Sequence, residues 1–273
     1  MSKSFLQTVY FALGLIACLA ASPAHADSIP QGFYNHDLNA GGNPITSEGV
    51  TTFTIKDKVC SKKNYNDSRG ENDCYNGNVR QDILFKKEAR MGETMSYKFE
   101  IWIDPSLKYT GYSNGNAKGF LKYNLDSRLF IATWQGQYIH NFLYILKADT
   151  SFGVTFLGNV CQPRKDFGNW VAFEMKVHWS KDTKGWIDVL CDGKSIYSAK
   201  DVATNQAPHC YITNQCEPDK KKNASRILLI LGPVMTGFGR EWKKYGKESE
   251  FTPIQPEGIT IKMRNISVTP IKN

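Results

Sequence analysis

Hydrophobic and polar residues alternate most regularly in residues 168–194. Every odd position of residues 171–179 is apolar, while the even positions 172–178 hold Ala, Glu, Lys and His. This period of two predicts a strand with one buried and one exposed face. After a polar loop at 180–185, residues 186–191 alternate again and end at Asp192-Gly193, a strong hairpin signal. We therefore expect a strand, a loop, a strand, a tight turn and a third strand at 194–197.

Similar short runs recur between turn signals along the rest of the chain. Further strands are expected at 51–55, 79–85, 95–103, 129–135, 139–146, 151–157, 227–231 and 259–269. An irregular lead-in is expected at 27–49, and polar loops at 56–77 and 203–224. The sequence has no internal repeat and no sustained helical periodicity. The pattern predicts an all-β fold, an antiparallel sandwich or jelly roll.

The N-terminal residues have the features of a secretory signal peptide. Lys3 supplies positive charge, residues 11–21 are apolar but too short to span a bilayer comfortably, and Ala24-His25-Ala26 has the form of a signal peptidase site. Removing 26 of the 273 residues leaves 247, which suits one all-β domain at 27–273. We expect a secreted or periplasmic protein without a membrane span; a retained N-terminal anchor is the alternative.

The cysteine count supports an oxidising compartment. Once Cys18 leaves with the signal, six cysteines remain, and an even number in an exported chain favours disulfides. Six cysteines allow 15 pairings. We favour the pairs that bracket a loop or neighbouring strands, namely Cys60–Cys74, Cys161–Cys191 and Cys210–Cys216. A zinc site is the alternative, but no two of the six have CxxC spacing, and we expect no metal site.

Net charge and motifs narrow the function. Lys and Arg outnumber Asp and Glu by 34 to 26, a formal charge of +8. A basic exported protein suits an anionic partner such as an acidic polysaccharide, nucleic acid or lipid head groups, although solubility alone would also explain the charge. The sequence contains no P-loop, no dinucleotide-binding fingerprint, no G-x-S-x-G elbow and no H-E-x-x-H.

Four segments resemble one known family in their order along the chain. They are residues 170–194, with the form W…xxxWS…G-x-(V/I)-x-(V/L)-x-x-(D/N)-G-K; Arg80-Gln81-Asp82-Ile83, similar to R-x-E-L; residues 92–106 (GETMSYKFEIWIDPS); and residues 129–136 (LFIATWQG). Together they resemble the jelly-roll polysaccharide lyases, the alginate, glucuronan and heparin lyase-like proteins, over about residues 79–232. The resemblance implies a concanavalin A-like β-sandwich with a concave groove. It also implies cleavage of a uronate-containing glycan by β-elimination.

Two family motifs are altered here. The family's Q-W-H reads Thr133-Trp134-Gln135, so Gln135 stands where the catalytic histidine is expected. The family's G-(I/L)-Y-(R/K) reads Leu231-Gly232-Pro233-Val234, without the tyrosine. The usual acid–base pair of the family is therefore not in its usual places.

The chemistry suggests which residues would take the remaining roles. β-Elimination needs a group that neutralises the sugar carboxylate, a base and an acid. Arg80 offers a planar fork for that carboxylate, and Gln135 is expected to donate to the same group; a surface arginine paired with Asp82 is the alternative. Tyr138 and His140, two residues apart, would face one side of an extended segment and move the protons, unless they are ordinary loop residues.

Other residues are candidates for substrate binding. Lys176 and His178 lie on the polar face of strand 171–179, where a merely solvated face is the alternative. Residues 237–246 combine basic and aromatic side chains, including Arg240, Trp242 and Lys243. Such a segment suits acidic sugars and also nucleic acid. The family resemblance and the signal peptide favour sugar.

These observations lead to an exported lyase-like protein that cleaves an anionic, uronate-containing glycan. The alternative is a non-catalytic, lectin-like protein on the same fold; a hydrolase, which would need two carboxylates across the groove, is a third hypothesis. We expect an anionic polysaccharide as partner, no nucleic acid, no membrane and a monomer. We expect no cofactor; a calcium requirement is left open, because the sequence does not reveal one.

Overall fold

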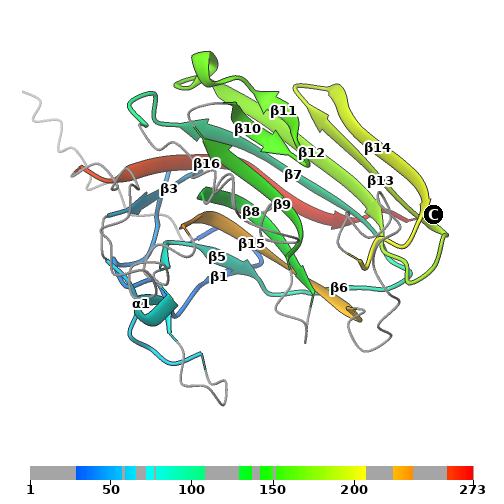
Figure 1. Ribbon diagram of the computed structural model, residues 1–273, viewed down its shortest axis with the longest axis horizontal. Coiled ribbons are helices and arrows are strands. Elements are labelled where there is room, and N and C mark those ends of the chain that lie inside the picture. Colours follow the sequence, from blue (N-terminus) through cyan, green and yellow to red (C-terminus); the bar gives the residue numbers. More distant parts are fainter. Residues whose placement is uncertain are drawn as a thin grey trace, which may run out of the picture.

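The computed structural model describes residues 29–56, 59–65, 72–76, 78–107, 129–136, 142–149, 152–206, 224–235 and 257–272. Nearly all of the regular secondary structure in these residues is β-strand. The strands form two antiparallel sheets that pack face to face (Figure 1). The predicted fold class, an all-β antiparallel sandwich, is confirmed.

One sheet has seven strands in the order β14-β13-β12-β7-β16-β3-β2. They are β2 (Ile45–Ser47), β3 (Val50–Ile55), β7 (Thr94–Ile103), β12 (Trp170–His178), β13 (Gly185–Cys191), β14 (Lys194–Val202) and β16 (Ile259–Pro270). The alternating stretch forms β12, and its odd residues are buried. Asp192 and Gly193 join β13 to β14 with φ values of 47° and 74°, as a type I′ turn requires. The predicted hairpin is confirmed.

The other sheet has nine strands in the order β1-β5-β15-β8-β9-β10-β11, with β4 and β6 also paired to β15. They are β1 (Phe33–Asn35), β4 (Val79–Arg80), β5 (Ile83–Phe85), β6 (Ala89–Arg90), β8 (Leu129–Gly136), β9 (Phe142–Asp149), β10 (Gly153–Phe156), β11 (Asn159–Gln162) and β15 (Arg226–Met235). A short helix, α1 (Asp73–Asn76), and a 3-10 turn, η1 (Arg164–Asp166), complete the elements. In Figure 1, α1 lies toward one end of this sheet and β6 toward the other.

Aromatic side chains fill the space between the sheets. Trp134 of β8 is fully buried, and its ring centroid lies 5.7 Å from that of Tyr97 and 6.0 Å from that of Phe173, both in the seven-stranded sheet. The indole N–H of Trp179 donates to the Tyr97 hydroxyl at 3.1 Å. Trp134 therefore points into the core, which directs the next residue of β8 outward.

Two predicted disulfides are confirmed. Cys60–Cys74 closes the loop before α1. Cys161–Cys191 joins β11 of the nine-stranded sheet to β13 of the other sheet. Cys210 and Cys216 lie outside the described residues, and so does the expected signal peptide at 1–26. Within the described ranges, no helix has the length and apolar character needed to span a membrane.

Some predicted boundaries are wrong. Segment 27–49 is not wholly irregular, since it contains β1 and β2, and loop 56–77 contains α1. The single strand expected at 79–85 is broken at Gln81-Asp82 into β4 and β5. Strand 227–231 continues through Gly232 to Met235, because Gly232 allows the backbone of β15 to pass close to that break: a Cβ on Gly232 would lie 2.5 Å from the Gln81 carbonyl oxygen.

Candidate functional site

Arg80 and Gln135 lie on the same outward face of the nine-stranded sheet. Val79 packs in the core, so the next residue, Arg80, points outward. Trp134 packs in the core, so Gln135 points outward as well. Because β4 and β8 both pair with β15 in one sheet, these two outward directions are the same.

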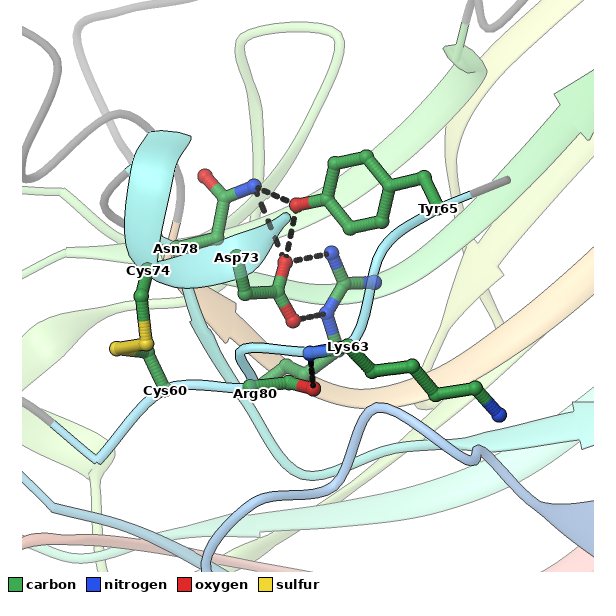
Figure 2. The surroundings of a disulfide bond; sticks show 8 residues. Cys60, Lys63, Tyr65, Asp73, Cys74, Asn78 and Arg80 are labelled. Carbon is green, nitrogen blue, oxygen red and sulfur yellow. Dashed lines mark hydrogen bonds and ion pairs between the residues drawn. A yellow bond between two sulfur atoms is a disulfide. The ribbon is translucent and has the colours of Figure 1, made fainter. Parts of the chain in front are cut away.

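The guanidinium of Arg80 is already bound to a carboxylate of its own chain. Nε and Nη2 donate to the two oxygens of Asp73 at 2.8 and 2.6 Å (Figure 2). Nη1 lies 3.7 Å from Asp82. The Arg80 side chain is 13% exposed, and both carboxylates are fully buried. Burial opposes the charge of Arg80, but Asp82 and Asp73 raise its pKa further above its ordinary value. The fork expected to hold a sugar carboxylate is therefore occupied by Asp73.

The loop before β4 holds Asp73 in this position. The Tyr65 hydroxyl donates to Asp73 at 2.5 Å, and the Asn78 amide donates to both groups. Burial, followed by the hydrogen bond to Asp73, raises the pKa of Tyr65 to about 12, so this phenol stays protonated at neutral pH. Cys74, next to Asp73 in α1, is tied to Cys60 by the disulfide (Figure 2). The cluster is a closed structural unit at one end of the sheet.

A histidine–aspartate pair adjoins this cluster, and sequence reasoning missed it. His36 follows β1 and lies opposite Asp82, with its backbone N–H donating to the Asp82 carbonyl. Its Nδ1 is 2.6 Å from Asp82 Oδ1, and 15% of the side chain is exposed. The amide of Asn39 further fixes Asp82 by bonding its backbone N–H and carbonyl. No motif in the sequence around His36 indicates this contact.

Gln135 lies well away from Arg80 on their shared face. Gln135 is opposite Leu228, whereas Arg80 is level with Val234 and Phe130. Phe130 and Gln135 are five residues apart on β8, so the two positions are separated by about 16 Å along the strands. This spacing does not suit the expectation that both residues contact one carboxylate.

The outward face between these two positions is buried and mostly apolar. Its residues alternate with core positions on β5, β8 and β15 and are at most 7% exposed: Leu84, Phe130, Thr133, Ile230 and Val234. The side chain of Gln135, in contrast, is partly exposed and makes no hydrogen bond within the described part of the chain. The accessible polar surface of this face therefore starts at the Gln135 end.

The remaining candidates separate into two groups. Lys176 and His178 lie on the outward face of the seven-stranded sheet, where Lys176 is 3.1 Å from Glu174 and His178 Nδ1 is 3.0 Å from the Thr94 hydroxyl. The structure therefore does not bring them to the surface that carries Gln135. The others lie outside the described residues: Tyr138, His140, Arg240, Trp242 and Lys243.

No metal centre is evident in the ranges that the structure describes. There, no group of three or more His, Cys, Asp or Glu side chains is arranged to hold a metal ion.

Among the comparisons with known proteins, only the comparison with solved structures finds similar proteins. The sequence matches no protein-family model, and no curated protein matches it. The fold is similar to an endo-β-1,4-glucuronan lyase from the fungus Trichoderma reesei, with a TM-score of 0.48 and 11% identity over 89% of each chain. It is also similar to the alginate lyase AlyC3, with a TM-score of 0.41 and 12% identity over 82% of this chain and 75% of that one.

A third similar structure is the carbohydrate recognition domain of Emp47p. The TM-score is 0.41 and the identity 8%, over 90% of this chain and 92% of that one. At these identities and TM-scores, none of these neighbours decides the substrate or activity of this chain.

Proposed function

We propose that this protein is an exported polysaccharide lyase-like protein that acts on an anionic, uronate-containing glycan at the outward face of the nine-stranded sheet. The observation that carries the proposal is the position of Gln135, which belongs to a lyase-like segment and is partly exposed on this outward face. The two disulfides support export, because such bonds form and persist in oxidising compartments.

The proposed reaction centre lies at the Gln135 end of this face. The amide N–H of Gln135 donates to the sugar carboxylate, which makes the proton on the neighbouring carbon easier to remove. Tyr138 and His140, which follow in the sequence, are proposed to take that proton and to give one to the leaving oxygen. Arg80 has a different role from the one expected, because its fork holds Asp73 and thereby fixes the disulfide-closed loop.

A binding function without cleavage is the second candidate. It is favoured by the engagement of Arg80, because the arginine expected to activate the substrate is bound within the protein. In this case, the same face binds an acidic glycan without cleaving it.

One assay separates the two candidates. The mature protein is incubated with alginate, glucuronan, hyaluronan and heparin, and the ultraviolet absorbance of the unsaturated product is followed. We expect cleavage of at least one polymer, lowered about a hundredfold in Gln135→Ala, the scale expected for losing one donor to a developing negative charge. Gln206→Ala, beyond β14 of the other sheet, is the matched control and should keep its rate. Binding without product from any polymer would reject the lyase and support the lectin-like function.

A further inference from the structure

Two arginines face each other at the Gln135 end of the nine-stranded sheet. Arg90 of β6 and Arg226 of β15 are directly opposite in the register of these strands. Both are exposed, and both alternate with core residues, Ala89 and Ile227. They therefore project outward from the same face as Gln135.

This pairing places two positive charges side by side. Directly opposite residues in an antiparallel pair have Cβ atoms about 4.5–5.5 Å apart, and like charges at that spacing are destabilising. Glu88 offsets part of the charge, with Oε2 3.4 Å from Nη1 of Arg226, but the two side chains are 24% and 50% exposed. Exposed ion pairs of this kind contribute little. The Glu93 carboxylate accepts a hydrogen bond from the Arg90 backbone N–H at 2.9 Å, but the Arg90 guanidinium has no ion-pair partner among the residues that the structure describes. The two carboxylates, Glu88 and Glu93, therefore leave the Arg90 guanidinium open to a further anion.

Gln135 completes a group of hydrogen-bond donors around the two arginines. It is opposite Leu228, two residues from Arg226, so Gln135 and Arg226 are diagonal neighbours. Diagonal neighbours are about 7–8 Å apart, within reach of long side chains. Two guanidinium forks and one amide therefore surround Leu228, which is only partly buried. Planar forks of this type match the two oxygens of a carboxylate.

We propose that Arg90, Arg226 and Gln135 form the site that binds the carboxylate of a uronate residue. The identity of the ligand as a sugar acid rests on the proposed function, whereas the attraction for an anion rests on the arginine pair itself. A bound carboxylate relieves the repulsion between the guanidinium groups and accepts hydrogen bonds from both. The site takes the role first expected of Arg80, whose fork is filled by Asp73.

Binding of a single sugar acid tests this site without any cleavage. The intact mature protein is titrated with sodium glucuronate at low ionic strength, and glucose serves as the uncharged control ligand. The dissociation constants are measured by saturation-transfer NMR. We expect glucuronate to bind and glucose to bind far more weakly. Arg90→Gln and Arg226→Gln should each weaken glucuronate binding about tenfold, as expected for the loss of a charge-assisted hydrogen bond. Lys200→Gln, an exposed charge on β14 of the other sheet, should leave the affinity unchanged.

The results distinguish failure of the proposed binding site from failure of the proposed lyase activity. Equal affinity for glucuronate and glucose in the wild-type protein, or wild-type glucuronate affinity in the Arg90→Gln, Arg226→Gln double variant, would overturn the site. Loss of glucuronate binding in the variants, with no cleavage of any polymer by the wild-type protein, would support the site and reject the lyase. Thermal unfolding of each variant checks its folding, and removing one of two repelling charges should leave the melting temperature equal or higher.

Discussion

At the scale of single residues, Asp73 makes several buried contacts, although it lies in a segment that the sequence predicts to be a polar loop. Its carboxylate is fully buried and accepts hydrogen bonds from Arg80, Tyr65 and Asn78. A carboxylate can be buried in this way only when its charge is paired and its oxygens are satisfied. Asp73 therefore holds the guanidinium of Arg80 in place and ties α1 to β4.

Replacing Asp73 should be costly. Asp73→Asn removes the bidentate partner of Arg80 and leaves only Asp82, at 3.7 Å, to balance its buried charge. We therefore expect the free energy of unfolding to fall by about 3 kcal/mol. Asp37→Asn is the matched control. Asp37 pairs with Lys63 at the surface and is 64% exposed, so its loss should cost at most about 1 kcal/mol. Urea unfolding measures both, and similar losses in the two variants would contradict a structural role for Asp73.

The sequence could not reveal these pairings. It suggested Asp82 as the alternative partner of Arg80, two residues away, and Asp82 does lie 3.7 Å from it. The bidentate partner is instead Asp73, delivered by a short helix inside an expected loop. The contact between His36 and Asp82 joins residues 46 positions apart, which no local pattern predicts. Arg90 and Arg226 were missed for the same reason, since only the register of two strands brings them together.

At the scale of elements, the long strands were predictable, whereas some of the shortest strands were not. β7, β12 and β13 contain several periods of alternation, because one face packs on the core and the other meets solvent. β1, β2 and β6 have two or three residues each, too few for a period to be visible. The sequence of β15 is an apolar run without alternation, because its outward residues are largely buried as well.

Gly232 determines how β15 passes the break between β4 and β5. Its φ is +125°, and a Cβ would lie 2.5 Å from the Gln81 carbonyl oxygen and 2.8 Å from the Asp82 Cα. Gly232→Ala should therefore lower the free energy of unfolding by about 2–4 kcal/mol, through backbone strain combined with overpacking. Gly193→Ala provides the control, with a φ of +74° and open space around its Cβ, and should cost about 1 kcal/mol. Equal losses in thermal unfolding would show that the close approach at Gly232 does not constrain the fold.

At the scale of the whole molecule, alternation predicted which residues face outward but not which sheet they belong to. Lys176 and His178 were correctly placed on a polar strand face, yet that face belongs to the seven-stranded sheet and is directed away from Gln135. The assignment of strands to sheets depends on long-range pairing, such as β15 between β5 and β8. A site built from several strands therefore needed the topology, which the sequence pattern alone does not contain.

The Cys161–Cys191 disulfide links the two sheets covalently, and its removal tests how far they depend on that link. The cysteines are 30 residues apart, so in the chain-entropy model the bond stabilises the folded protein by about 3.5 kcal/mol. Replacing both cysteines with serine should lower the melting temperature by about 10 °C for a domain of this size. Hydrogen exchange should rise mainly in β11 and β13, because these strands lose their connection. The matched Cys60→Ser, Cys74→Ser variant should instead raise exchange around α1 and β4. If the first variant melts within about a degree of the wild-type protein, core packing alone holds the sandwich together at this edge.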